Sequence, residues 1–389
     1  MSNLLRQIKH LRIALNQDRD CPNVRELGLR QTHGEHVNSE LEDRIEYFMS
    51  KQAVGRSTQV NDGIGVGSSK GPVREENQDR AAVAYIVKPS GEALLIALIC
   101  DGMGGMKEGG AAAGCAAGTF LARLAVPSGA PIGSQILGAV NAANAEVHRR
   151  FRGDGGTTLT ALVIKGSGEA WVTHVGDSRL YVSRSDRSLD LLTRDDTIGG
   201  QLNQITDANE DNLDNRLLQF VGIGKTIEPH IFPVSDALNS TFIITSDGAH
   251  SIGKKSLERI SRNSRSPGEL ARKITYVAEA MGVEDNSSAV VIYANDFSPS
   301  PRFARGTELT LWSPSERLEM WLASPREVDQ PSQEESQPTG QPVAKTKKAA
   351  RSPRKTNKQA GGNKGRVSEN EIEKPQLNIE FNSKSKKQE

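Results

Sequence analysis

The sequence predicts an α+β fold built on antiparallel sheets, and three features favour this over a doubly wound parallel sheet. Short apolar runs outnumber the helical stretches, they arrive in hairpin-like pairs, and Gly-rich turns separate them. The apolar runs predict strands over residues 93–99, 158–164, 170–175, 179–183, 241–245 and 288–293. Small or apolar residues at helical spacing predict helices over residues 109–124, 132–151 and 256–281.

Composition divides the chain into four segments. They are an N-terminal helical arm at 1–55, the strand-rich region at 60–297, a Pro/Ser linker with a short apolar island at 298–324, and a disordered basic tail at 325–389. The arm has amphipathic spacing near 4–15 and a second possible helix near 41–48. It is either a docking or regulatory arm or an extension packed on the main domain.

The bulk composition excludes several classes of protein. The three cysteines, Cys21, Cys100 and Cys115, form no CxxC pair, which argues against a disulfide framework or a zinc site. The N-terminus lacks the apolar core of a signal peptide, and no apolar run approaches the roughly 18 residues of a membrane span. We therefore expect a cytoplasmic monomer with no membrane partner. The basic tail leaves nucleic acid open, but its single aromatic residue, Phe381, offers little to stack on bases.

Four aspartates occupy tight-turn sequences, and three of them adjoin expected core strands: Asp79, Asp101, Asp247 and Asp285. Burying a carboxylate is costly unless it is paired or binds a metal, and oxygen ligands suit Mg²⁺ or Mn²⁺. Asp101 can bridge two cations, and Gly102 lets a backbone carbonyl approach one of them. One Asp-Gly pair alone would be a plain turn, but the set predicts a two-metal hydrolase centre.

An ordered series of motifs over residues 60–297 resembles the protein phosphatase 2C family of metal-dependent Ser/Thr phosphatases, most closely its bacterial branch. The motifs are Arg74-x4-Asp79, Asp101-Gly102-Met103-Gly104-Gly105, Gly156-Thr157-Thr158, Gly176-Asp177-Ser178-Arg179, Ser246-Asp247-Gly248 and Asp285-Asn286. The resemblance implies a four-layer α-β-β-α sandwich of two antiparallel sheets flanked by helices, with a dinuclear site in a cleft at one end.

The resemblance also implies a reaction and a set of roles. Two Mn²⁺ or Mg²⁺ ions would activate water to hydrolyse phosphoserine or phosphothreonine, with phosphoproteins, a Ser/Thr kinase and its targets as partners. The residues implied as metal ligands are Asp79, Asp101, Gly102, Asp247 and Asp285. Arg74 is implied to hold the substrate phosphate, because a guanidinium binds phosphate oxygens in bidentate fashion.

The chain departs from the family pattern at several positions. Gln78 stands where many relatives carry glutamate, and Met103 replaces a histidine that some eukaryotic relatives use as general acid. Ser251 occupies a common aspartate position, and Asp154 lies near the Gly-Thr-Thr turn as the candidate ligand of a third, weaker metal. The alternative function is therefore a catalytically decayed phosphatase fold that recruits partners through its arm and tail. Asp177 is interpreted as a structural turn residue that caps backbone amides.

Overall fold

The structure is a computed structural model, and it describes residues 34–51, 55–61, 63–103, 106, 108–183, 188–202, 216–296 and 306–323. All of these residues lie in one compact unit, Met1–Asp329. The first expected helix of the arm, near 4–15, and the basic tail at 325–389 lie outside the described residues.

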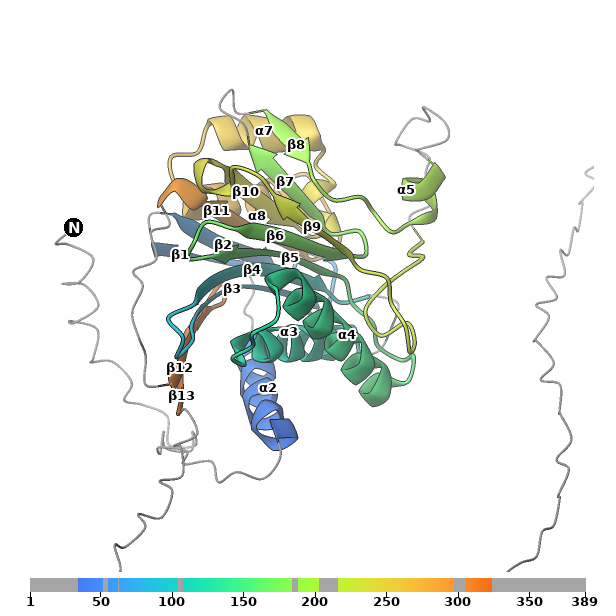
Figure 1. The fold of residues 1–389 in the computed structure, drawn as a ribbon. Helices are drawn as coiled ribbons and strands as arrows, with labels where there is room; N and C mark the ends of the chain where they lie inside the picture. The colour runs from blue at the N-terminus through green and yellow to red at the C-terminus, as the bar shows by residue number, and fades with distance from the viewer. Residues whose placement is uncertain are drawn as a thin grey trace, which may run out of the picture. The chain divides into compact units, whose positions relative to one another are not determined.

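Two antiparallel sheets form the centre of this unit (Figure 1). The six-stranded sheet consists, in spatial order, of β1 (Arg56–Asn61), β2 (Ile64–Ser69), β11 (Ser287–Tyr293), β10 (Thr241–Thr245), β7 (Arg179–Ser183) and β8 (Leu189–Leu191). The seven-stranded sheet consists of β13 (Arg317–Ala323), β12 (Gly306–Trp312), β3 (Asp79–Val87), β4 (Ala93–Asp101), β5 (Leu159–Lys165), β6 (Ala170–Val175) and β9 (His230–Val234). Every paired strand in both sheets is antiparallel.

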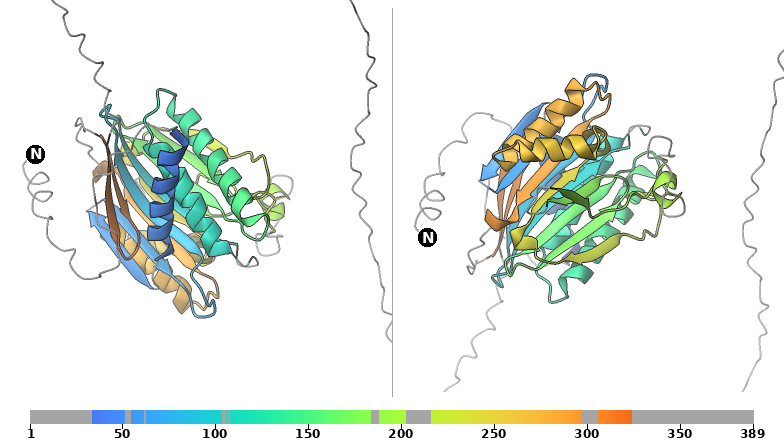
Figure 2. Two further views of the ribbon diagram at one scale, coloured as in Figure 1. Left: turned by 90° about the horizontal axis from the view of Figure 1, so that it is seen from below. Right: turned by 90° about the horizontal axis from the view of Figure 1, so that it is seen from above.

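Helices cover the outer faces of both sheets. Those beside the seven-stranded sheet are α2 (Gly34–Ser50), α3 (Gly109–Ala125) and α4 (Ile132–Phe151), and Figure 2, seen from below, shows them lying across it. Those beside the six-stranded sheet are α6 (Asp247–His250), α7 (Lys254–Arg262) and α8 (Pro267–Ala280). A short helix, α5, spans Ile198–Leu202, and two 3-10 turns span Ala237–Asn239 and Ala294–Asp296. The expected four-layer α-β-β-α sandwich is confirmed.

The layered arrangement explains why the apolar runs in the sequence are continuous and do not alternate with polar residues. Strand β4 is covered on both faces, so its side chains divide between two cores with a period of two. Leu95 and Ile99 enter the core between the sheets, whereas Leu94, Ile96 and Leu98 pack toward the helices. A third core lies between the six-stranded sheet and α7 and α8.

The helix expected over 256–281 is wrong in one respect, because it is two helices. Helix α7 ends at Arg262 and α8 begins at Pro267. Ser266 caps α8 by accepting a hydrogen bond from the Glu269 amide (3.2 Å), and the Glu269 side chain accepts one from the Arg265 amide (2.8 Å). These two side-chain caps, with proline at the first helical position, start a new helix where apolar spacing alone suggested continuity.

Part of the expected linker at 298–324 belongs to the sheet. Residues 306–323 form the hairpin β12–β13, and β12 pairs with β3. Leu309 and Leu311 are buried on the helix side, and Trp312 packs toward the core between the sheets. The apolar island is therefore an alternating strand pair that extends the sheet, while residues 297–305 and 324 lie outside the described part.

The second helix expected in the arm is present as α2 and packs on α3. Leu41, Ile45 and Met49 are buried there. The backbones approach closely, since a Cβ at Gly118 would lie 3.0 Å from the Glu42 carbonyl oxygen. No helix in the described residues is both long and apolar enough to cross a membrane.

Candidate active site

Strand pairing brings the four predicted aspartates to the same end of the sandwich. Asp79 opens β3 and lies directly opposite Asp101, which ends the antiparallel neighbour β4. Asp247 begins α6 two residues after β10 ends, and Asp285 lies two residues before β11, the antiparallel partner of β10. The end of one strand meets the start of the next in each pair, so turn residues far apart in sequence become neighbours.

Two adjoining hollows, of about 530 and 630 Å³, lie at these strand ends. Arg74, Asp247 and Asp285 line both of them. Asp101 and Gly102 line the larger hollow. We refer to the two hollows together as the carboxylate cavity. The structure thus brings every predicted ligand except Asp79 into the cavity lining, and it places Asp79 against Asp101 in the sheet beneath.

Asp79 is fully buried and only partly satisfied. The Ser246 hydroxyl donates to its Oδ2 atom (2.9 Å), while Oδ1 has no hydrogen-bond partner among the described residues. Burial raises the pKa of Asp79 to about 6, and the charge of Asp247 acts in the same direction against hydrogen bonds from Ser288 and Ser246. A buried, orphaned carboxylate oxygen is costly unless a cation or proton completes it.

Asp101 lies in the middle of the carboxylate group. Its carboxyl is in hydrogen-bonding contact with those of Asp79 and Asp247. Burial raises the pKa of Asp101 well above its usual value, and the charges of Asp79 and Asp247 raise it further. Burial and the charge of Asp285 likewise raise the pKa of Asp247. Carboxylates in mutual contact must share protons or cations, because like charges disfavour ionisation of the group.

The donor set fits a hydrated divalent cation of the Mg²⁺ or Mn²⁺ type. It offers only oxygen atoms, including the orphaned Oδ1 of Asp79. Among the described residues, no group of three or more His, Cys, Asp or Glu side chains is arranged so that it could hold a metal ion by itself. Mg²⁺ generally keeps several waters and uses only one or two carboxylates at a time, so an open set of this kind is suitable.

The loop after Asp101 is held by the Gly-Thr-Thr turn. The Thr158 amide (2.9 Å) and the Thr157 hydroxyl (2.8 Å) both donate to the Asp101 carbonyl, and the Met103 amide donates to the Gly156 carbonyl (3.0 Å). A Cβ at residue 102 would overlap the Gly109 carbonyl oxygen at the start of α3, so this close packing requires glycine. Gly104 and Gly105 lie outside the described residues.

Arg74 faces the cavity and forms an ion pair there. Its Nη2 atom lies 2.6 Å from Asp285 Oδ2, and the two side chains are 39% and 36% exposed. Asn286 ties this loop to β11, because its side-chain Oδ1 accepts from the Gln78 amide (2.8 Å) while its Nδ2 donates to the Lys70 (2.7 Å) and Glu76 (3.0 Å) carbonyls. The sequence showed Asn286 only as part of the Asp285-Asn286 motif. Its anchoring role was missed because its partners are distant in the sequence.

The structure changes the interpretation of two further aspartates. Asp154 is exposed and lies outside the cavity lining, so the structure does not bring the third-metal candidate to the other carboxylates. Asp177, expected to be a turn residue, lines the larger hollow with Asp101 and Asp247. Burial raises the pKa of Asp177 to about 8, reinforced by the charges of Asp247 and Asp195. The sequence signal for this role was the position of Asp177 between two expected strands, 170–175 and 179–183.

The residues that depart from the family pattern lie in or beside the carboxylate cavity. Met103 lines the larger hollow and Ser251 the smaller one, where the Ser251 hydroxyl donates to the Gly248 carbonyl (2.8 Å). The Gln78 backbone supports Gly102, whose amide donates to the Gln78 carbonyl (3.3 Å). Arg216, which no sequence argument singled out, also lines the larger hollow.

Comparisons with known proteins agree with this architecture. A family profile described as Protein phosphatase 2C matches residues 66–288, more than half of the chain. The PPM Ser-Thr phosphatase MsPP from Mycobacterium smegmatis, solved in complex with cacodylate, is 28% identical, with 59% of this chain and 97% of that chain covered and a TM-score of 0.50. The S. agalactiae serine/threonine phosphatase shares the fold at 22% identity, with 59% and 98% covered and a TM-score of 0.52. No curated protein matches the sequence. Helix α2 and the β12–β13 hairpin lie outside the matched residues.

Proposed function

The chain belongs to the protein phosphatase 2C family, and from this membership we propose that it is a metal-dependent phosphatase that hydrolyses phosphoserine and phosphothreonine in proteins. One observation carries the proposal beyond the family. Asp101 contacts both Asp79 and Asp247 at the strand ends, with an orphaned oxygen on Asp79 and no ion pair between any of the three and a basic side chain of the described residues. This arrangement supports a site that is completed by metal ions.

We assign the cation-binding roles to the residues that the sequence singled out. Asp79, Asp101, Asp247, Asp285 and the Gly102 carbonyl would hold two Mn²⁺ or Mg²⁺ ions. When bound, such ions supply an activated water for in-line attack and neutralise charge on the phosphoryl group. The contacts of Asp101 with carboxylates on both sides support a bridging role for it.

Arg74 would orient the substrate phosphate. One of its N–H groups is engaged by Asp285, and a guanidinium has further donors in the same plane. Both residues are more than one-third exposed at the cavity rim, so a phosphate on a protein surface can reach them without entering a deep tunnel. Val73 lines the same hollow at 60% exposure and offers apolar contact to residues beside the phosphorylated side chain.

The test is hydrolysis of a phosphothreonine peptide by the full chain, with and without Mn²⁺, for the wild type and Asp247→Asn. We expect turnover to require the metal and to fall by at least about 10²–10³-fold in the variant, the usual range for losing one electrostatic group at a reacting centre. Asp43→Asn, which changes an exposed carboxylate on α2, is the matched control and should retain full activity.

Two results would contradict the proposal. Turnover that is independent of metal or of Asp247 would exclude the dinuclear assignment. A folded wild-type protein without turnover would instead support the decayed binding module, in which the fold recruits partners and performs no hydrolysis.

A further inference from the structure

Helices α7 and α8 adjoin the carboxylate cavity. Ser251, which lines the smaller hollow, lies three residues before α7 begins at Lys254, and Val283, in the same lining, lies three residues after α8 ends at Ala280. Because consecutive Cα atoms are about 3.8 Å apart, the start of α7 lies within about 11 Å of Ser251. Figure 2, seen from above, shows both helices on the outer face of the six-stranded sheet. A protein bound at the cavity can therefore reach α7.

Helix α7 presents a basic face to solvent. Leu257 is fully buried against the sheet, whereas Lys255, Arg259 and Arg262 are exposed. These three basic residues are spaced by four and three positions, so they lie on one side of the helix, opposite the buried side. Lys254 is exposed beside them at the end nearest the cavity. We call these four residues the basic face.

The two lysines at the start of α7 do not stabilise the helix. A helix N-terminus carries partial positive charge, so acidic side chains are favoured in the first turn and basic ones are disfavoured. Helix α7 has no acidic residue in its first turn and no side-chain cap at Gly253. Helix α8, in contrast, begins with the Ser266 cap and has Glu269 in its first turn. Lys254 and Lys255 thus add positive charge where helix formation alone opposes it.

Three residues of the basic face also lack an acidic partner in the protein. Among the described residues, no ion pair joins Lys254, Lys255 or Arg259 to an acidic side chain. Glu258, the one acidic residue of α7, accepts a hydrogen bond from the Leu189 amide (3.3 Å). The positive charge of this helix therefore remains available to an external anion.

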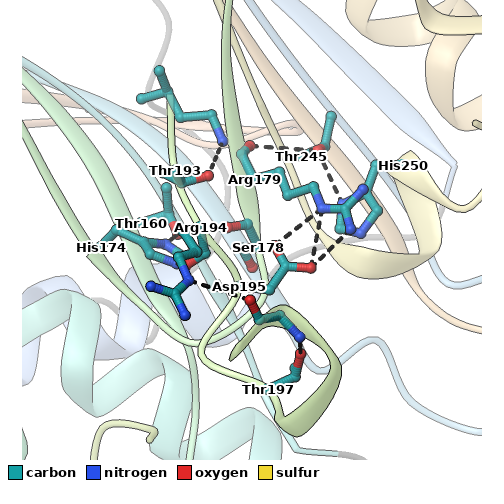
Figure 3. Close-up of polar contacts among 12 residues, drawn as sticks. Thr160, His174, Ser178, Arg179, Thr193, Arg194, Asp195, Thr197, Thr245 and His250 are labelled. Atoms are coloured by element: carbon teal, nitrogen blue, oxygen red, sulfur yellow. Dashed lines mark hydrogen bonds and ion pairs between the residues drawn. The ribbon is translucent and has the colours of Figure 1, made fainter. Parts of the chain in front are cut away.

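Two arginines beside the cavity show the opposite arrangement. Arg179 binds Asp195 through its Nε (3.0 Å) and Nη2 (2.8 Å) atoms, as Figure 3 shows. Arg74 forms its ion pair with Asp285 (2.6 Å). Where a basic side chain supports the fold or the cavity, a carboxylate accompanies it. An exposed basic helix without such carboxylates attracts and orients an acidic partner.

We propose that the basic face of α7 docks acidic side chains that flank the phosphorylated residue of a protein substrate. This docking role rests on the proposed phosphatase function and specifies its substrates as phosphoproteins with an acidic segment beside the phosphorylated site. The nine residues of α7 span about 13 Å, and an extended peptide rises about 3.3 Å per residue. Acidic residues about three to seven positions from the phosphorylated residue would therefore meet the basic face.

The first experiment uses two phosphothreonine peptides of equal length, with glutamates or with glutamines at those flanking positions. At low ionic strength and saturating Mn²⁺, we expect the wild type to hydrolyse the acidic peptide with a kcat/KM at least about fivefold higher. Arg259→Glu should lower kcat/KM for the acidic peptide by about fivefold, the upper range for one exposed charge pair. Hydrolysis of p-nitrophenyl phosphate, which is too small to touch α7, should be unchanged.

Lys225→Glu is the matched control, because it makes the same change of charge at another exposed lysine. Lys225 lies outside the cavity lining and follows Gly224, which contacts Asn144 of α4 (2.9 Å) on the other sheet's helical layer. This variant should keep the preference of the wild type for the acidic peptide. Equal melting temperatures of the two variants show that both are folded.

A second readout measures docking without catalysis. The anisotropy of a fluorescein-labelled oligoglutamate peptide that carries no phosphate should report binding to the full chain, and added salt should weaken it. Arg259→Glu should bind the peptide about fivefold more weakly than Lys225→Glu does. The basic tail is present in both variants, so a difference between them comes from α7.

The outcomes separate the docking role from the proposed function. If the wild type hydrolyses neither phosphopeptide but binds oligoglutamate through Arg259, the phosphatase function fails and the docking surface stands. If it hydrolyses both peptides equally well and the two variants bind oligoglutamate alike, the docking role fails and the function stands. A single-stranded oligonucleotide of equal charge that binds more tightly, and loses this affinity in Arg259→Glu, would overturn the assignment of an acidic protein partner.

Discussion

Two groups of partly or fully buried acidic side chains have opposite electrostatic environments in this fold. Glu146 on α4 receives hydrogen bonds from Arg149 (2.9 and 2.6 Å) and Arg150 (2.6 Å), and Arg150 also binds Glu46 of α2 (2.7 Å). The bonds from Arg149, together with those from Arg150, lower the pKa of Glu146 to about 2. In the carboxylate cavity, burial raises the pKa of Asp79 to about 6.

The difference shows which acidic side chains are neutralised by basic side chains of the same chain and which are not. In the helix group, which we call the Glu146 cluster, arginines from the same chain neutralise the carboxylates and join α2 to α4. In the carboxylate cavity Asp101 contacts two other aspartates, and the ion pair that Arg74 forms among the described residues is with Asp285 at the rim. Charges that are paired internally support the fold, whereas unpaired ones are consistent with an external cation.

The largest expected effect is a pH dependence that separates the two groups. Below pH 8 the folded protein retains a proton on Asp177, whose pKa is raised to about 8, while the unfolded chain has released it. The Asp177 contribution to metal-free stability should therefore fall as pH rises from about 6 to 8, by up to about 1.4 kcal/mol per pH unit, and it should level off above pH 8. Glu146 is ionised in both states over this range and contributes no slope.

Urea unfolding in EDTA at pH 7, 7.5 and 8 measures this slope, because above pH 8 the buried thiols Cys100 and Cys115, whose pKa burial raises, add a decline of the same sign. The buried histidines His174 and His250 do not interfere, because burial lowers their pKa and they are neutral in both states above pH 7. Saturating Mg²⁺ should remove the decline, since metal ligands bind better when deprotonated. Stability in EDTA that stays constant or rises with pH would contradict the electrostatic description of the cavity.

The next largest effect should come from breaking the Glu146 cluster. Arg150→Ala leaves Glu46 and Glu146 without their shared partner and should cost about 2 kcal/mol of unfolding free energy. Phosphatase activity should be unchanged. Arg149→Ala is the matched control, because Arg149 is 68% exposed and its bonds go to Glu146 on the same helix, so its urea midpoint should fall less than that of Arg150→Ala. Equal losses in both variants would mean that the link to α2 adds nothing.

The smallest of the three effects concerns Arg74, a cation at the cavity rim. Arg74→Ala should raise the KM for a phosphothreonine peptide about tenfold and change kcat less, because charge-assisted hydrogen bonds to the phosphate are lost. Steady-state kinetics at saturating Mn²⁺ tests this, with Arg149→Ala as the surface control. If KM and kcat are both unchanged, Arg74 is not part of the substrate site.

Several elements could be predicted from the sequence because their signals are local. Apolar periodicity placed helix α4 and most core strands, and the Asp-Gly turns marked the candidate ligands. Two errors arose where a local signal was incomplete. The cap at Ser266 interrupts a spacing that continues on both sides, and the alternation of β12 and β13 was too short to show which strand they would join.

What the sequence determined by itself is the α+β class, the family and the set of turn aspartates, since turn chemistry and periodicity act over a few neighbouring residues. Only the tertiary structure decided which carboxylates share a cavity. Asp177 lies among them and Asp154 does not, although the sequence suggested a turn role for Asp177 and a metal-ligand role for Asp154. The reason is register: antiparallel pairing sets which strand ends meet, and the contacts of Asp196 and Ser178 leave Asp177 facing the cavity.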